Sequence, residues 1–166
     1  LFDNIFGAVN LGILAEHLPV LLAVHLRRDP FYVCNSLINA RLSRHGDIAV
    51  HYGNHPRNMD EIDRLDDPIE RIVAQVRETE DEFQSILSRL PSGNVLAVDY
   101  EDMTAAPMMA PERFAEFMAR NGVDIERREI QFGCELKNRN NPGLVNPDYA
   151  GRLEKHFETY FPSEPV

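Results

Sequence analysis

VLLAVHLRRDPFYVCNS, residues 20–36, decides how this chain folds. The stretch begins with seven mostly apolar residues, a short run that is typical of a strand buried on both faces of a parallel sheet. Pro30 then suits the first turn of a helix, and Asp29 suits its N-cap. Arg27 and Arg28 therefore lie in the turn between a strand and a helix.

The rest of the chain extends this pattern in both directions. Hydrophobic periodicity and turn residues predict helices over 5–16, 30–43, 67–90, 111–121 and 149–160. They predict buried strands over 20–26 and 94–100, the second followed by a turn. Residues 44–66, between the second and third helices, are expected to form an irregular excursion. This order predicts an α/β fold of three layers with a mostly parallel sheet and right-handed crossovers. Because two strands do not make a domain core, we expect the sheet to be incomplete in this chain, with further strands supplied from upstream.

Bulk composition excludes several classes of protein. The 166 residues, 43% hydrophobic and 27% charged, suit a single domain over 1–166, and no apolar run is long enough for a membrane span. A net charge of −10 argues against nucleic acids and anionic membranes as partners. Cys34 and Cys134 are too few for a disulfide framework and fit no zinc pattern, so we expect free thiols, a cytoplasmic location and no metal.

Basic side chains gather in one part of this acidic chain. Residues 17–57 hold five arginines against Asp29 and Asp47, whereas acidic residues predominate elsewhere. Ligands of open α/β sheets bind at the carboxyl ends of strands, and a helix N-terminus with arginines beside it attracts anions through free amides and guanidinium donors. The arginine pair therefore suits a small anion such as phosphate, although pairing with surface acids explains it equally well from electrostatics alone.

At this point the sequence resembles a known family. VHLRRDPFYVCNS resembles the 3′-phosphate-binding segment of the sulfotransferases, in which a buried strand ends in Arg, commonly Arg-Asp-Pro, with a Ser eight positions later; Arg28 and Ser36 match it. LAVDYEDMTAAP resembles the family's strand that ends in Tyr-Glu-Asp, and by that match Tyr100 falls near the adenine. The resemblance covers residues 18–122. Beyond it, ELKNRNNPG is a loose counterpart of the family's C-terminal basic segment, where Arg139 is the candidate phosphate contact.

The resemblance implies a fold of the phosphate-loop nucleotide-hydrolase type and a defined reaction. The donor would be 3′-phosphoadenosine 5′-phosphosulfate, the product adenosine 3′,5′-bisphosphate, and the acceptor a hydroxyl or amine of a small molecule, lipid or carbohydrate. Arg28, Ser36, Tyr100 and Arg139 would bind the donor. No metal takes part.

The chain also departs from the family pattern. No segment fits the phosphosulfate loop, and Gly7 and Gly12 lie within helical periodicity. The family's catalytic base would fall around residues 1–6, where only Asp3 is ionisable, so the catalytic residue is unassigned. His17 suits a helix C-terminus, and the histidines of the excursion suit a solvated loop. We therefore expect an N-terminal part of the domain to be missing, and this chain alone to be inactive.

Two other functions stay open: a non-catalytic α/β interaction module that uses the acidic helix 67–90, and another phosphate-loop phosphotransferase. Binding of adenosine 3′,5′-bisphosphate in preference to ATP would separate the sulfotransferase from both. The acceptor is not readable from the sequence. Uncovered apolar parts of the sheet would favour association, so a homo-oligomer also stays open.

Overall fold

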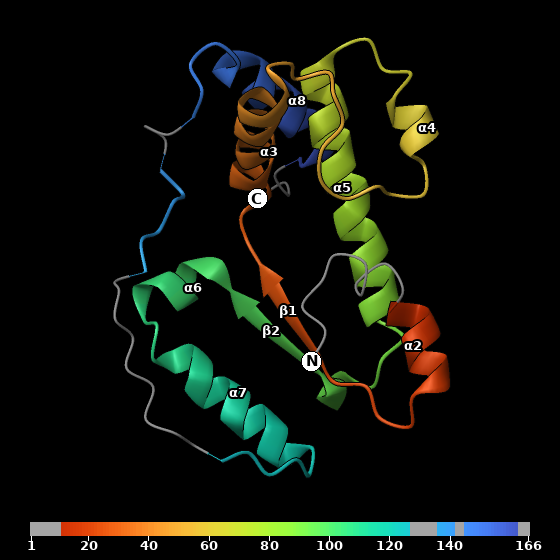
Figure 1. The fold of residues 1–166 in the computed structure, drawn as a ribbon, viewed down its shortest axis with the longest axis vertical. Coiled ribbons are helices and arrows are strands. Elements are labelled where there is room, and N and C mark those ends of the chain that lie inside the picture. The colour runs from red at the N-terminus through yellow and green to blue at the C-terminus, as the bar shows by residue number, and fades with distance from the viewer. Residues whose placement is uncertain (1–10, 127–135, 142–144, 163–166) are drawn as a thin grey trace.

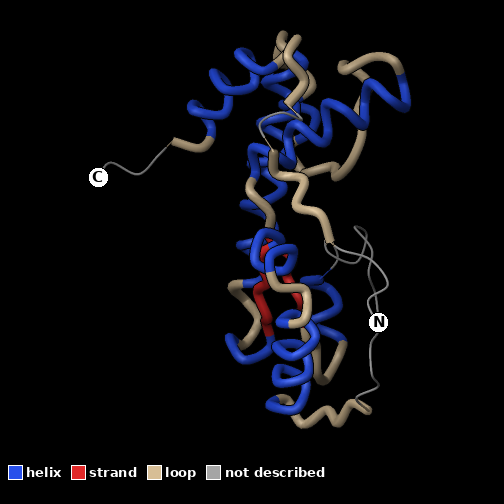
Figure 2. Tube along the Cα trace, turned by 90° about the vertical axis from the view of Figure 1, so that its left-hand side faces the viewer, coloured by secondary structure: helices blue, strands red, loops and turns tan. Residues whose placement is uncertain are grey.

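The computed structural model describes residues 11–126, 136–141 and 145–162. They form a mixed α/β arrangement, with the strands near the middle of the long axis and helices toward both ends (Figures 1 and 2). The elements are α2 (Leu11–His17), β1 (Ala23–Arg27), α3 (Pro30–His45), α4 (Met59–Ile62), α5 (Pro68–Leu87), a 3₁₀ turn (Ser92–Asn94), β2 (Val95–Asp99), α6 (Tyr100–Ala105), α7 (Met109–Arg120) and α8 (Ala150–Tyr160).

The two predicted strands pair in parallel, in a register that runs from Ala23 opposite Val95 to Arg27 opposite Asp99. Within the described residues they form a two-stranded sheet. The parallel arrangement was predicted correctly. The register also places the residues that follow the strands, Arg28 and Tyr100, at the same edge of the sheet.

Helix α7 covers one face of the sheet over β2 but not over β1. Leu96 and Val98 are buried against Phe117 of α7. Val24 and Leu26, which lie opposite them on β1, are 51% and 53% exposed. We expected β1 to be buried on both faces. This expectation is wrong for the described part of the chain, because none of its elements covers the face of β1 that carries Val24 and Leu26.

The segment after β2 differs from the sequence prediction. Residues 100–105 form the helix α6 in place of a turn, with Glu101 and Asp102 in its first turn, where acidic side chains are favourable. Helix α7 then begins two residues before Pro111. It ends as predicted, with Gly122 in the left-handed conformation at φ 73°.

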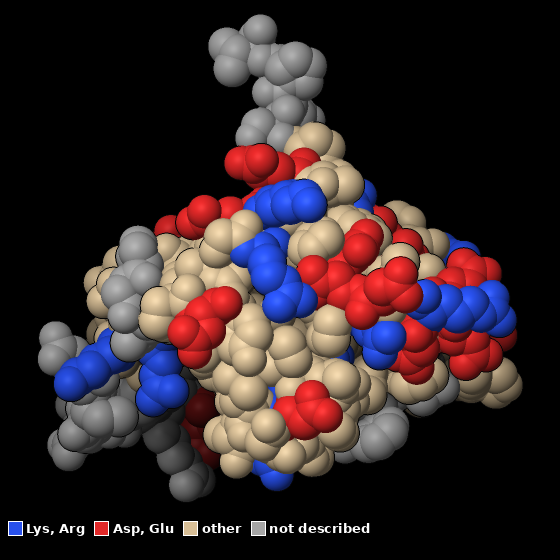
Figure 3. Space-filling view, turned by 90° about the horizontal axis from the view of Figure 1, so that it is seen from above, with Lys and Arg blue, Asp and Glu red and all other residues tan. Residues whose placement is uncertain are grey.

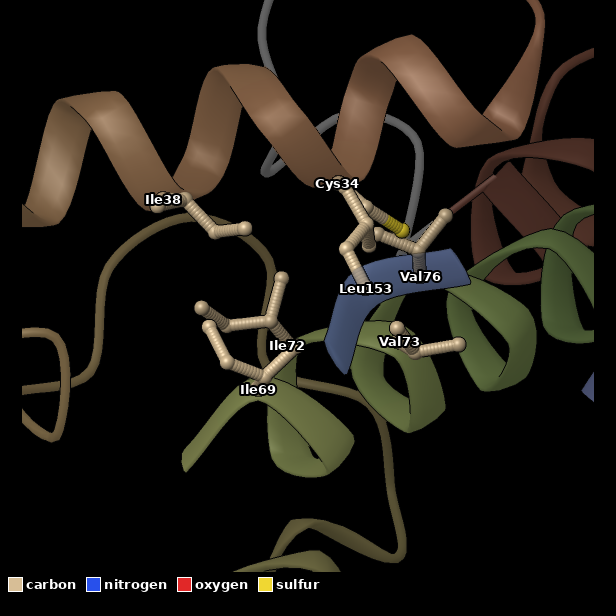
Figure 4. Packing of buried hydrophobic residues seen from close by; sticks show 7 residues of the cluster. All are labelled: Cys34, Ile38, Ile69, Ile72, Val73, Val76 and Leu153. Atoms are coloured by element: carbon tan, nitrogen blue, oxygen red, sulfur yellow. The ribbon is translucent and has the colours of Figure 1, made fainter. Parts of the chain in front are cut away.

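The main core lies where α3, α5 and α8 meet (Figure 4). Its buried side chains are Cys34, Ile38, Ile69, Ile72, Val73, Val76 and Leu153. The predicted N-cap of α3 is confirmed, because the Asp29 carboxylate accepts from the Phe31 N–H at 2.9 Å. The N-cap of α5 is Asp67, whose carboxylate accepts from the Ile69 N–H at 2.8 Å. Each helix has a proline in its first turn. These caps determine the residues at which α3 and α5 begin.

Helix α8 is joined to the start of α5 by charged groups as well as by the core. The Asp67 carboxylate accepts from Arg152 Nε at 3.1 Å and lies 3.0 Å from His156 Nε2. At this end of the molecule, acidic and basic side chains are mixed, and neither sign forms a continuous patch in Figure 3. The face seen there therefore offers no extended surface for a polyanion.

The excursion after α3 is held by a buried arginine. Arg41 is 1% exposed, and it donates to the Ile48 carbonyl at 2.9 Å and to Gln75 Oε1 at 2.7 Å. The Gln75 amide in turn donates to the carbonyls of Tyr52 and Asn54. Arg41 is one of the five arginines of residues 17–57, but burial removes it from the surface and gives it a structural role.

The remaining expectations concern thiols, histidines and membrane spans. Cys34 is free and buried, and burial raises the pKa of its thiol. His17 ends α2 as predicted. In the residues that the structure describes, no helix is long and apolar enough to cross a membrane, and no cluster of His, Cys, Asp and Glu could hold a metal ion. Asp3, Gly7, Cys134 and the first part of the predicted helix 5–16 lie outside the described residues.

Candidate functional site

Arg28 stands between the end of β1 and the start of α3, and its side chain has three partners. Its Nη1 atom donates to Ser36 Oγ at 3.1 Å, and its Nε atom donates to Asn140 Oδ1 at 2.8 Å. Its guanidinium carbon lies 5.0 Å from the centre of the Tyr100 ring. The eight-residue spacing brings Arg28 and Ser36 together because Ser36 lies two turns into α3, within reach of a long side chain folded back along the helix.

Tyr100 contributes both its ring and its hydroxyl. The ring faces the guanidinium of Arg28, a cation–π arrangement that parallel pairing permits because both residues directly follow paired strand ends. The hydroxyl donates to the Lys137 carbonyl and accepts from the Arg139 N–H, each at 3.2 Å. These two hydrogen bonds hold residues 137–139 against the start of α6.

All four residues predicted for the donor site therefore meet at the strand ends, although in different ways. Arg28, Ser36 and Tyr100 contribute side chains to the cluster. Arg139 joins it through its main chain, and its side chain is exposed. Their role in binding a phosphate stays a prediction.

Two residues of the cluster were missed by the sequence reasoning. Asn140 accepts from Arg28 and donates to Glu101 Oε1. The same Glu101 oxygen accepts from the Asp29 N–H at 3.1 Å. No sequence signal pointed to Asn140, because an asparagine in a Gly- and Asn-rich segment suits any loop. Glu101 directly follows Tyr100 in the quoted Tyr-Glu-Asp motif, which could have pointed to it.

The two neighbouring arginines are in opposite electrostatic situations. Arg27 forms a two-point salt bridge with Asp99, with Nε–Oδ1 at 2.9 Å and Nη2–Oδ2 at 2.8 Å. Arg28 is held by a hydroxyl, an amide oxygen and an aromatic face, and no salt bridge joins it to a carboxylate among the described residues. Arg27 therefore contacts a carboxylate directly, whereas Arg28 is separated from the nearest carboxylate of its cluster, Glu101, by the Asn140 amide.

The expectation of free backbone amides at the start of α3 needs correction. The Asp29 carboxylate accepts from the Phe31 N–H, and Glu101 accepts from the Asp29 N–H. These acceptors occupy amides that an anion would otherwise use. Donors for an anion at this point must therefore come mainly from side chains.

A cavity of about 740 Å³ lies beside the cluster, between the end of β1 and helix α5. Arg28 and Glu101 border it, but Ser36 does not. Glu80 of α5 is also in its wall, and burial raises the pKa of this carboxyl, opposed by Arg77 and supported by Asp81 and Asp29. The cavity thus offers space for a bound molecule next to Arg28, and the carboxylates of Asp29, Glu80, Asp99 and Glu101 also line it.

Comparison with protein-family models assigns the chain to a family. The family model described as "Sulfotransferase family" matches residues 4–121. No curated protein and no solved structure matches the chain. The matched range includes Arg28, Ser36 and Tyr100 at the strand ends, and it ends before Arg139 and Asn140. Since it spans well over half of the sequence, the chain belongs to the sulfotransferase family.

Proposed function

We propose that the cluster at the strand ends binds the 3′-phosphate of 3′-phosphoadenosine 5′-phosphosulfate. The observation that carries the proposal is that uncharged groups hold Arg28 on three sides, so that its position is determined while no described carboxylate contacts it directly. The neighbouring Arg27, in contrast, is paired with Asp99. Arg41 is also held by uncharged groups, but it is buried and does not border the cavity, whereas Arg28 does.

The hydrogen-bonding capacity of Arg28 supports the same assignment. A guanidinium has about five N–H donors, and Ser36 and Asn140 take one each. About three donors are left for a ligand, enough for a two-point contact with a phosphate.

The other residues would complete the donor site. The Ser36 hydroxyl can turn its proton toward a phosphate oxygen while it accepts from Arg28. Tyr100 would lie near the adenine, with one face of its ring already covered by Arg28. The exposed side chain of Arg139 would approach the phosphate from the segment that Tyr100 holds.

The reaction would be transfer of a sulfuryl group to an acceptor hydroxyl or amine. The acceptor oxygen or nitrogen attacks sulfur, the bond between sulfur and the bridging phosphate oxygen breaks, and adenosine 3′,5′-bisphosphate leaves with that electron pair. The acceptor proton passes to a base that we do not assign. Arg28 and Ser36 would bind and orient the donor, which contributes through positioning. The acceptor would be a small molecule, lipid or carbohydrate, and a cytoplasmic location stays a prediction.

Calorimetry with three nucleotides tests the proposal. Adenosine 3′,5′-bisphosphate should bind at least about tenfold more tightly than adenosine 5′-monophosphate, which lacks the 3′-phosphate. ATP should bind no better than the monophosphate. Equal binding of ATP and the bisphosphate would favour a phosphate-loop phosphotransferase, and binding of none of them would favour an interaction module.

A radiolabelled-donor assay over a panel of hydroxyl and amine acceptors tests catalysis separately. We expect no turnover by this chain alone, since residues 1–166 contain no recognisable phosphosulfate loop. Turnover by the chain would show that this expectation is wrong.

A further inference from the structure

Hydrogen bonds connect the side chain of Arg28, through those of Asn140 and Glu101, to the backbone N–H of Asp29. Arg28 Nε donates to Asn140 Oδ1, and Asn140 Nδ2 donates to Glu101 Oε1. Glu101 also accepts from the Asp29 N–H at the start of α3. These three hydrogen bonds join the start of α3, the segment 136–141 and the first turn of α6 to one another.

The partners of Asn140 determine which way its amide points. A carboxylate can only accept, so the side of the amide that faces Glu101 must be the NH₂ group. A guanidinium can only donate, so the side that faces Arg28 must be the oxygen. With both ends specified, the amide cannot turn over without losing both hydrogen bonds.

An amide at this place has an electrostatic consequence. It fixes the Nε edge of Arg28 with a neutral acceptor, whereas a carboxylate would neutralise the arginine as Asp99 neutralises Arg27. The remaining N–H groups of Arg28 are then directed by Asn140 and Ser36 together.

We infer that Asn140 is a positioning residue, which aims Arg28 at the 3′-phosphate and is itself held in place by Glu101. The inference rests on the proposed function, since the phosphate is the ligand toward which Arg28 would be aimed. It adds a determinant of donor recognition that lies outside the matched range 4–121. The predicted effect is on selectivity for the 3′-phosphate.

The test is a double-mutant cycle, measured by calorimetry on the full chain with adenosine 3′,5′-bisphosphate and adenosine 5′-monophosphate. Asn140→Ala should weaken bisphosphate binding about tenfold and leave monophosphate binding within about twofold, because only the former uses Arg28 fully. When Arg28 is already alanine, Asn140→Ala should have no further effect on either ligand. Asn140→Asp should be worse than Asn140→Ala, because the carboxylate would pair with Arg28 and repel the phosphate.

The outcomes separate the inference from the proposed function. If the unmodified chain does not prefer the bisphosphate, the proposed function itself fails. If it does, and Asn140→Ala keeps the preference, Asn140 does not position Arg28. The inference would also be overturned if Asn140→Ala weakened bisphosphate binding equally with Arg28 present and with Arg28 replaced by alanine, since Asn140 would then act independently of Arg28. Equal losses for both nucleotides would mean a general structural role and would count against it too.

Discussion

Arg28 Nε and Asn140 Oδ1 lie 2.8 Å apart although 112 positions separate the two residues in the chain. This contact joins the segment after α7 to the strand ends, where Tyr100 also holds the Lys137 carbonyl and the Arg139 N–H. The candidate site is therefore built from three separate segments, of which two lie in the matched range. Changes in any of the three should alter recognition of the 3′-phosphate.

Arg28→Ala should weaken binding of adenosine 3′,5′-bisphosphate by about 1.5 to 3 kcal/mol, because it removes a charge-assisted contact. Arg57→Ala is the matched control, since Arg57 is an exposed arginine of the same basic range 17–57, and its loss should cost under about 1 kcal/mol. Calorimetry measures both. Similar losses for the two variants would indicate a diffuse basic patch in place of a defined site.

Arg41→Met should lower the free energy of unfolding by about 2 to 4 kcal/mol, because the Ile48 carbonyl and Gln75 Oε1 would lose a buried donor. Bisphosphate affinity of the folded protein should stay within about twofold, as Arg41 lies away from the strand ends. Urea unfolding followed by circular dichroism checks the first result. Unchanged stability would mean that Arg41 is not what holds the excursion.

Tyr100→Phe should weaken bisphosphate binding by a factor of about three to ten, because the segment 137–139 loses both hydrogen bonds to the hydroxyl. Tyr100→Leu should weaken it further, since the ring beneath Arg28 is lost as well. Phe161→Leu removes a comparable arginine–aromatic contact, with Arg77 at 5.4 Å and away from the cavity, and should leave binding unchanged. An equal effect at Phe161 would point to general destabilisation.

Asp67→Asn should destabilise the protein in a way that depends on pH. Burial would raise the pKa of Asp67, but hydrogen bonds from Arg152, the Ile69 N–H and His156 outweigh it and lower the pKa from 3.8 to about 2. The charged form therefore contributes fully above about pH 4, and the contribution is lost as the pH falls toward 2.

At pH 7 the expected loss for Asp67→Asn is about 1 to 2 kcal/mol, allowing for solvent screening. Asn keeps the N-cap, so the charge is the main change. The difference from the unmodified chain should shrink below pH 4 in urea titrations. Asp66→Asn, at the exposed neighbouring position, should show little change at any pH. A constant difference across the pH range would mean that the charge is not responsible.

Val24→Lys should reduce self-association of the chain, because Val24 belongs to the apolar part of the sheet that α7 leaves uncovered. Val50→Lys is the control, as Val50 is also exposed but lies in the excursion. Sedimentation velocity over a range of concentrations gives the distribution of species. If Val24→Lys associates as strongly as the unmodified chain, this face does not mediate association.

Local chemistry in the sequence determined most of the elements. Apolar runs marked both strands, and Asp-Pro pairs marked the starts of α3 and α5 because capping and proline geometry depend on neighbouring residues alone. The eight-residue spacing placed Ser36 beside Arg28 for the same reason, since helix geometry fixes short distances along the chain. Misjudged local features were the helix α6 and the start of α7.

Other properties depended on partners that are distant in the sequence. The burial of Arg41 is decided by Gln75 and the Ile48 carbonyl, and the exposure of Val24 by the fact that α7 stops over β2. Arg27 and Arg28 are identical in type and adjacent in sequence. The parallel register sets Asp99 opposite Arg27, so Arg27 forms a salt bridge. Asn140 lies at the strand ends as well, so Arg28 has an amide partner in place of a carboxylate.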